Sequence, residues 1–299
     1  MGGLPDFLQF IIAGLAQGSI YAIVAVGFTI IFSCTQVVNF AQGEFVMIGA
    51  LTSYGLIVGL HWPPWLAVPA AILVSLVVGM ALGWIIMRPL KNASVPSLII
   101  ITVGASMLMQ GFASQIWGKD AVSVAPFTTG EFLWQIPRTP YPVVIDYQSV
   151  WVMGFMLIIV LALTLFFNHT MVGKAMRAVA VNRHGARLIG VNVSRMVIGA
   201  FALSAAIGAA AGAVIVPISC GYYNMGTMLG LKGFAAAIVG GLGNFPGSII
   251  AGLLLGVLES FGAGYISSQY KDAFAFIILL VVLVTSPQGL LAFKRRRAG

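Results

Sequence analysis

The sequence predicts an all-α, polytopic membrane protein, and three observations lead to that fold class. Of its 299 residues, 60% are hydrophobic and only 7% are charged, whereas about 25% of the residues in a soluble domain carry charge. The mean hydropathy is +1.04. The apolar residues form long continuous runs that short polar loops separate. Such runs cross a bilayer as helices, because a helix satisfies its own backbone hydrogen bonds.

The apolar runs predict eight or nine crossings, since a helix needs about 20 apolar residues to span about 30 Å of hydrocarbon. The eight clear runs cover residues 7–32, 45–60, 65–87, 95–116, 150–167, 196–216, 247–264 and 273–291. A polar break at residues 33–43 separates the first two runs. Residues 231–243 reach only about 20 Å at 1.5 Å per residue, so we expect a short or re-entrant helix there.

The distribution of basic residues predicts the orientation of the chain. Lys and Arg concentrate on cytoplasmic loops. An outer N-terminus and a cytoplasmic C-terminus place eleven of the 15 Lys and Arg residues inside the cell. The long polar segment 117–148 then forms a periplasmic loop, and the basic segment 169–195 lies in the cytoplasm. We therefore expect a single transmembrane domain over residues 1–299.

The basic segment after the fifth crossing is predicted to form two short helices. Helix formers run over residues 173–182, His184-Gly185 interrupts them, and a second stretch ends at residues 190–192. The first helix would place Lys174, Arg177 and Val181 on one side, and Met176, Val179, Ala180 and Arg183 on the other. Neither side is uniformly apolar, so docking into a protein groove fits better than lying on lipid. A loop that only sets the topology is the alternative.

A similar pattern recurs in the two halves of the chain. Asn39-Phe40-Ala41-Gln42-Gly43 precedes one crossing, and Asn244-Phe245-Pro246-Gly247 precedes another. Paired interrupted helices mark the substrate path in many transporters. Irregular backbone at membrane depth is tolerated where protein or a water-filled cavity satisfies its polar groups, so either break is expected to line a cavity if it is buried.

Three ionisable residues lie near the membrane interior, namely Glu44, Lys232 and Glu259. An ion-coupled carrier usually needs such an acid. Glu44 starts a helix, where the dipole favours a carboxylate, and Glu259 lies toward the outer end of its crossing, so a structural role is favoured for both. Lys232 has two interpretations that we leave open: it extends to the outer interface, or it faces the substrate path.

The sequence contains no pattern that indicates catalysis. It has no phosphate-binding loop, no cluster of metal ligands and no nucleophile with a neighbouring base. The two cysteines, Cys34 and Cys220, are too far apart in sequence to suggest a disulfide framework. We therefore expect neither an enzyme nor a bound cofactor, and the basic residues do not indicate a nucleic-acid partner. Transport would draw on an ion gradient or on ATP that another subunit hydrolyses.

Ordered motifs along the whole chain resemble one family of transport proteins. The motifs are Gly18-Ser19-Ile20-Tyr21-Ala22, residues 38–45, residues 173–178, Gly190-Val191-Asn192-Val193, residues 230–237, Gly240-Gly241-Leu242-Gly243, Tyr270-Lys271-Asp272 and Pro287-Gln288-Gly289-Leu290. In these motifs the chain resembles the permeases of bacterial branched-chain amino acid ABC importers, the Liv type, and most closely the shorter of their two permeases.

The resemblance implies a permease of the bacterial inner membrane with several protein partners. These are two cytoplasmic ATPase subunits, a second homologous permease and a periplasmic substrate-binding protein. It implies an ATPase-coupling helix that includes Gly173, Lys174, Ala175, Met176, Arg177, Ala178 and Asn182. We also expect a translocation pathway that includes Asn39, Gln42, Gly43, Glu44, Lys232 and Phe234. The expected substrates are branched-chain or other hydrophobic amino acids.

Two positions depart from the family pattern. Gln42 stands where many members have His, and Gly233 stands where Ala is common. Relatives in the family carry urea or short amides. The alternatives are therefore an ion-coupled secondary carrier and a channel for small amides such as urea.

Overall fold

The computed structural model describes residues 3–87, 95–135, 137, 141–286 and 289–290. It contains eleven α-helices within these residues: α1 (Leu4–Thr35), α2 (Gln42–Tyr54), α3 (Pro64–Met87), α4 (Val95–Ile116), α5 (Tyr147–His169), α6 (Met171–Val181), α7 (Arg183–Leu188), α8 (Val193–Ser219), α9 (Met225–Gly240), α10 (Phe245–Tyr265) and α11 (Lys271–Thr285). A π-helical turn, Gly55–Gly59, continues α2, and a 3-10 turn, Ser268–Tyr270, precedes α11. The basic loop predicted at Arg88 and Lys91 and the basic residues 294–297 lie outside the described residues.

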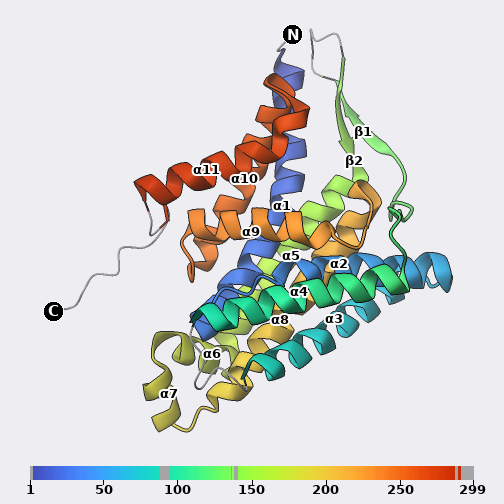
Figure 1. Ribbon diagram of the computed structural model, residues 1–299. Helices are drawn as coiled ribbons and strands as arrows, with labels where there is room; N and C mark the ends of the chain where they lie inside the picture. The colour runs from blue at the N-terminus through green and yellow to red at the C-terminus, as the bar shows by residue number, and fades with distance from the viewer. Residues whose placement is uncertain (1–2, 88–94, 136, 138–140, 287–288, 291–299) are drawn as a thin grey trace.

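Among the described residues, seven helical segments are long and apolar enough to cross a membrane. They are α1, α3, α4, α5, α8, α10 and the segment Ser268–Thr285 that includes α11. The two helices that fall short are α2, with 13 residues, and α9, with 16. The expectation of eight or nine crossings therefore depends on these two helices. Figure 1 shows both of them in the middle of the molecule, between the longer helices.

The core forms around α1 and α8, which are the most deeply buried of the seven long helical segments. Small residues allow the backbones of neighbouring helices to approach closely. On the contact of α1 with α10, a Cβ added to Gly256 would lie 2.3 Å from the backbone of Gly18. On the contact of α2 with α8, a Cβ added to Gly212 would lie 1.9 Å from the Val46 carbonyl oxygen. The Gly and Ala residues of these helices therefore set the distances between them.

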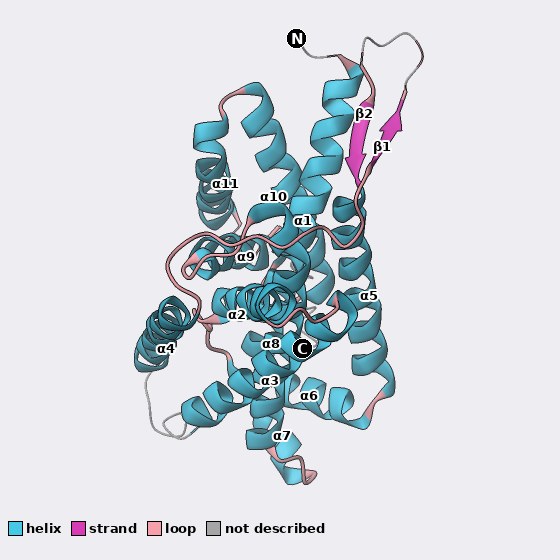
Figure 2. Ribbon diagram, turned by 90° about the vertical axis from the view of Figure 1, so that its right-hand side faces the viewer, coloured by secondary structure: helices cyan, strands magenta, loops and turns pink. Residues whose placement is uncertain are grey.

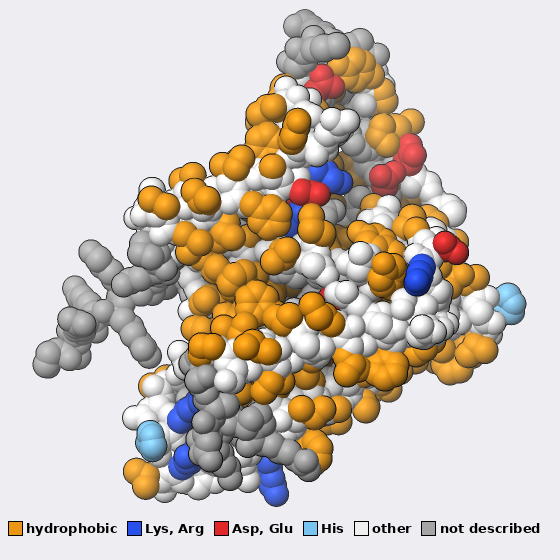
Figure 3. All heavy atoms as spheres, in the orientation of Figure 1, with side chains coloured by type: hydrophobic (Ala, Val, Ile, Leu, Met, Phe, Trp, Pro, Cys, Tyr) orange, Lys and Arg blue, Asp and Glu red, His pale blue; other side chains and the backbone are white. Residues whose placement is uncertain are grey.

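Helices α4 and α5 and the Ser268–Thr285 segment bury much less of their surface. Large apolar side chains on α4, such as Ile100, Met107 and Phe112, are more than half exposed, at 71%, 68% and 61%. Hydrophobic side chains cover much of the face that Figure 3 shows, over α4, α9 and α11. An apolar surface of this extent fits contact with lipid or with another membrane subunit.

The segment between α4 and α5 contains structure that the sequence did not predict. Strand β1 (Glu131–Trp134) pairs antiparallel with β2 (Val143–Asp146), and Phe132 lies opposite Ile145. Gln9 of α1 holds this hairpin through two 2.9 Å bonds, because its side chain donates to the Val144 carbonyl and accepts from the Val144 amide. The hairpin and the N-terminal end of α1 consequently share one end of the molecule, and α6 and α7 lie at the other (Figures 1 and 2).

Several predicted boundaries were wrong by a few residues. The short helix expected at residues 231–243 begins at Met225, because Asn224 and the turn before it start the helix earlier. The break expected at His184-Gly185 lies at Asn182 instead. The Asn182 side chain accepts a hydrogen bond from the Gly185 amide at 2.9 Å, so it caps α7, and His184 and Gly185 belong to that helix.

Candidate functional site

The break between α1 and α2 lies inside the protein. Gln36 ends α1 in a left-handed conformation with φ of 57°. Asn39 is 1% exposed, and its Oδ1 atom accepts a hydrogen bond from the Ala41 amide at 3.2 Å. The Phe40 amide donates to the Thr102 hydroxyl of α4 at 3.2 Å. Irregular backbone at this depth thus obtains hydrogen-bond partners from nearby side chains.

Gln42 and Gly43 attach the start of α2 to two neighbouring helices. The Gln42 side chain is fully buried, and its Oε1 atom lies 2.6 Å from the Ser204 hydroxyl of α8. Ser204 also lies 2.9 Å from the Gly27 carbonyl oxygen of α1. Gly43 faces α9, where a Cβ added to it would lie 1.9 Å from the Gly226 carbonyl oxygen. Both residues therefore fix α2 in place.

Glu44 forms a buried polar network between α2, α4 and α9. Its side chain is 1% exposed, and its Oε1 atom accepts hydrogen bonds from the Ser106 hydroxyl at 2.9 Å and the Gln110 amide at 2.8 Å. The same Gln110 nitrogen donates to the Thr227 hydroxyl of α9 at 2.8 Å. The Oε2 atom of Glu44 has no hydrogen-bond partner among the described residues.

A cavity of about 330 Å³ adjoins this network. Ser106, Gln110 and Thr227 line its polar side, and Phe28 and Phe40 lie on its apolar side. The ring of Phe234, which is expected in the pathway, is 5.6 Å from the ring of each of these two phenylalanines. Phe234 thus supports the cavity wall from behind, whereas Glu44 lies next to its polar side.

Lys232 belongs to a second network, which joins α1, α9, α10 and α11. Its Nζ atom lies 2.7 Å from Glu259 and 2.6 Å from Asp272, and it donates to the Tyr21 hydroxyl at 3.0 Å. The Tyr21 hydroxyl in turn donates to Glu259 at 2.9 Å. The side chains of Lys232 and Glu259 are 6% and 7% exposed. Internal partners therefore hold the charge of Lys232, which also lines a separate cavity of about 210 Å³ together with Tyr21 and Asp272.

Replacing Lys232 with Met is expected to destabilise the folded chain by about 3–5 kcal/mol, the usual cost of removing one partner from a buried ion pair. The variant leaves Glu259 buried without its cation. Thermal unfolding in detergent measures the effect. Lys271→Met is the matched control, since Lys271 is exposed and makes no ion pair among the described residues. Equal unfolding temperatures for the two variants would contradict a structural role for the network.

The predicted coupling segment forms a compact elbow of α6 and α7. Thr170 caps α6, because its hydroxyl accepts a hydrogen bond from the Gly173 amide at 3.0 Å. A Cβ added to Gly173 would lie 2.3 Å from the Phe166 carbonyl oxygen, so glycine allows the tight turn from α5 into α6. Arg183 of α7 donates to the Cys34 carbonyl oxygen at the end of α1. Partial burial lowers the pKa of this guanidinium.

The elbow buries one side of α6 and exposes the other. Met176 and Val179 are 3% and 1% exposed, and the Met176 side chain faces Gly199 of α8. Lys174, Arg177 and Asn182 are exposed, and Ala175 and Ala178 are half-buried. The division into two sides that the sequence predicted is thus confirmed. Of the expected coupling residues, Gly173 and Met176 position the elbow, and the others are accessible from outside.

The tip of the elbow is strongly apolar, which the sequence analysis did not single out. Val181, Leu188 and Ile189 are 72%, 89% and 75% exposed. Basic side chains also lie at this end of the molecule (Figure 3). Exposed apolar side chains near polar ones are typical of a protein-docking site.

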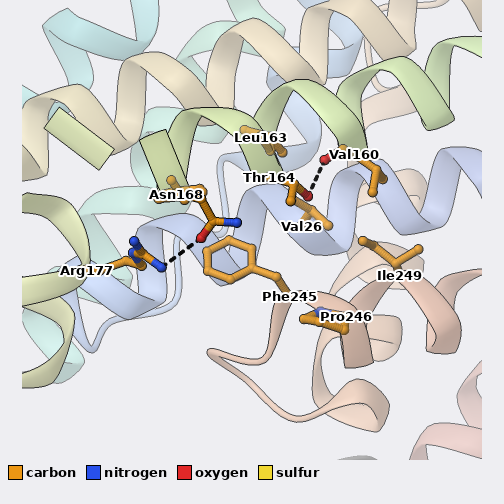
Figure 4. Close-up of a pocket in the computed structure, with 10 residues that line it drawn as sticks. Val26, Val160, Leu163, Thr164, Asn168, Arg177, Phe245, Pro246 and Ile249 are labelled. Carbon is orange, nitrogen blue, oxygen red and sulfur yellow. Dashed lines mark hydrogen bonds between the residues drawn. The ribbon is translucent and has the colours of Figure 1, made fainter. Parts of the chain in front are cut away.

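A larger cavity lies elsewhere, against α5 and α10. It has a volume of about 450 Å³, and most of its lining is apolar. Figure 4 shows Val160 and Leu163 of α5 opposite Phe245 and Ile249 of α10, with Arg177 at one end. None of the six residues named for the translocation pathway lines it, but Phe245 and Pro246 do, and they belong to the second of the two similar segments that were expected to line a cavity.

The sequence matches a known family over residues 10–283, and that family is described as the permease component of branched-chain amino acid transport systems. The chain belongs to this family. LivH of Salmonella typhimurium, a "high-affinity branched-chain amino acid transport system permease protein", is 34% identical to this permease over 95% of each chain. BraD of Pseudomonas aeruginosa, which has the same description, is 33% identical over 97% of each chain. The ribose import permease RbsC of Escherichia coli is 28% identical over 90% of this permease and 83% of RbsC.

The fold of the permease also resembles a solved structure. A chain of PsaBC from Streptococcus pneumoniae, in complex with Fab, superposes with a TM-score of 0.52. The alignment covers 94% of the permease and 92% of that chain, at 14% identity. At this identity the likeness concerns the fold alone.

Sequence reasoning missed the residues of the permease that surround Glu44 and Lys232. Ser106 and Gln110 are separated from Glu44 by 62 and 66 positions, and Asp272 follows Lys232 by 40. One signal was available, because Thr102, Ser106, Gln110 and Ser114 are polar residues that recur every four positions on α4. Residues at that spacing share one face, and a polar face inside a membrane helix points to a buried partner.

Proposed function

We propose that this permease is the membrane subunit of an ATP-driven importer that carries branched-chain or other hydrophobic amino acids across the bacterial inner membrane. The similarity to LivH and BraD over nearly the whole chain supports the substrate class. The observation that carries the mechanism is the rigid α6–α7 elbow, which presents an exposed apolar tip at the end opposite the hairpin.

The elbow lies in the cytoplasm and docks into an ATPase subunit. Its basic residues support that side of the membrane, because Lys and Arg favour cytoplasmic loops. Arg183 attaches it to the end of α1, and Met176 attaches it to α8, so movement of the elbow reaches the two central helices. ATP-driven closure of two ATPases would then shift the helices between outward-open and inward-open arrangements.

The outer end of the permease receives substrate from a periplasmic binding protein, and a second homologous permease completes the path. Large apolar side chains are exposed on α4, and the same helix contributes Val103, Ser106, Met107 and Gln110 to the lining of the cavity next to Glu44. This exposed apolar face supports contact between α4 and another membrane subunit. A homologous partner would close the open side of that cavity. Selectivity is then shared between the binding protein and the path.

Reconstitution into proteoliposomes tests this function. The permease, a sister permease, two ATPase subunits and the binding protein are combined with radiolabelled leucine. We expect uptake that requires both ATP and the binding protein, and that stops when the ATPases are inactivated. Uptake by the permease alone under an ion gradient would contradict the proposal and favour an ion-coupled carrier. Passive, non-saturable entry of urea would favour a channel.

A further inference from the structure

The cavity between α1, α4 and α9 is amphiphilic. Apolar side chains cover most of its wall, and a polar strip occupies one side. The apolar residues are Phe28, Phe40, Val103, Met107 and Leu231. The polar strip consists of Ser106, Gln110 and Thr227. Its volume of about 330 Å³ lies at the lower end of the range for small-molecule sites, and such sites combine apolar walls with a few placed polar groups.

Glu44 lies behind the polar strip: it binds Ser106 and Gln110 but does not itself line the cavity. Both Ser106 and Gln110 donate to its Oε1 atom, which leaves Oε2 without a partner among the described residues. Oε2 points toward α9, where Gly226 leaves space for it: a Cβ there would lie 2.5 Å from this oxygen. Gly226 directly precedes Thr227 of the strip. A buried carboxylate oxygen with no partner is costly, so it calls for a functional explanation.

The groups around the cavity suit a cation and not an anion. The described residues that line it include no Lys, Arg or His. Lys232 lies on the same helix, but its charge is held by Glu259 and Asp272. Because the Gln110 nitrogen donates to Glu44 and Thr227, its amide oxygen is an additional acceptor. The rings of Phe28 and Phe40 present π faces that attract a cation.

We propose that this cavity binds the α-ammonium group of a hydrophobic amino acid, with the Gln110 amide oxygen as acceptor, Glu44 behind Gln110, and the aliphatic side chain against Phe28 and Met107. The proposal deepens the transport function and rests on it. An ammonium site would make the translocation path itself selective. A substrate without an ammonium group would leave the Gln110 acceptor unpaired, so the path would reject it. The carboxylate of the substrate is not recognised by the cavity.

Protection of a cysteine from alkylation tests the site directly. Met107 lines the cavity and is 68% exposed, so Met107→Cys reports on occupancy. The background is Cys220→Ser, since Cys220 is exposed and Cys34 is buried. The full-length chain in nanodiscs is labelled with a maleimide in the presence of leucine, 3-methylbutylamine, which lacks the carboxylate, or 4-methylpentanoate, which lacks the ammonium group. Leu108→Cys, on the same helix and 58% exposed but outside the cavity lining, is the control.

We expect leucine and 3-methylbutylamine to slow labelling at position 107 and 4-methylpentanoate to leave it unchanged. Adding Glu44→Gln should weaken the apparent affinity for both amines by roughly tenfold or more, the effect expected from losing the charge-assisted hydrogen bond that Gln110 donates to Glu44. Thr52→Val, a buried α2 residue whose hydroxyl has no partner among the described residues, should have no effect. Gln110→Met should cause the same kind of loss, and it replaces Glu44→Gln if that variant does not fold.

Three results would overturn the ammonium site: equal protection by 4-methylpentanoate, no protection by either amine, or protection that survives both substitutions. Labelling of the cysteine does not require transport, so the ammonium site and the transport function can be disproved independently. Absence of ATP-dependent uptake in the reconstituted complex overturns the transport function. Unselective protection in a complex that does transport leucine overturns the ammonium site alone.

Discussion

Replacing Gly43 with Ala is expected to prevent the folded permease from accumulating in the membrane. The added methyl group would lie 1.9 Å from the Gly226 carbonyl oxygen and 2.8 Å from the Gly230 Cα atom. All of these atoms belong to backbone, so no side chain can rotate away. Separating α2 from α9 would also strain the Gln42 contact with Ser204. We expect a loss of about 3 kcal/mol or more, at the upper end of overpacking effects.

The amount of monodisperse chain extracted in mild detergent, and its unfolding temperature, measure this effect. Gly104→Ala on α4 is the matched control, because a Cβ there meets nothing within 4 Å. An exposed Gly→Ala change in a helix is neutral or slightly stabilising. If Gly43→Ala and Gly104→Ala gave equal yields and equal unfolding temperatures, the close contact between α2 and α9 would be wrong.

Replacing Leu188 with Asp is expected to abolish ATP-driven uptake without unfolding the permease. Leu188 is 89% exposed, so the substitution removes no internal contact. If the elbow docks into an ATPase groove, the apolar tip becomes buried there, and an unpaired charge at that position costs at least about 2 kcal/mol of binding. Association should weaken roughly thirtyfold or more.

Co-purification of the ATPase subunits with tagged permease measures this association, and uptake in proteoliposomes measures its consequence. Leu133→Asp provides the matched control, since Leu133 is 58% exposed on β1 at the opposite end of the molecule. The control should retain its ATPases. Normal co-purification and uptake by the Leu188→Asp permease would rule out the elbow tip as the docking surface.

The long helices could be predicted because membrane burial depends on composition, which is visible locally. α5 and α10 lie within a few residues of the runs that predicted them. The hairpin could not be predicted in this way. Its four-residue strands, EFLW and VVID, are too short to show a pattern of alternation. They depend on Gln9, more than a hundred positions away, to hold them against α1.

The candidate site could also be predicted only in part. The sequence located Glu44 and Lys232 because a charge in an apolar run is conspicuous. It could not distinguish their environments, since these depend on which helices are neighbours. Lys232 meets two acids from α10 and α11, whereas Glu44 meets only neutral donors from α4. That difference gives Lys232 a network of ion pairs and leaves Glu44 with one carboxylate oxygen that has no hydrogen-bond partner among the described residues.

We propose that the α6–α7 elbow is the part of the permease that an ATPase holds. Photo-crosslinking from the elbow tip tests it most directly. A benzophenone maleimide attached to Leu188→Cys, in the Cys220→Ser background and in native membranes, is irradiated and the adducts are identified by mass spectrometry. We expect a covalent adduct of the permease with an ATPase subunit. An adduct with the periplasmic binding protein, or labelling of the introduced thiol only by reagents added from the periplasmic side, would contradict it.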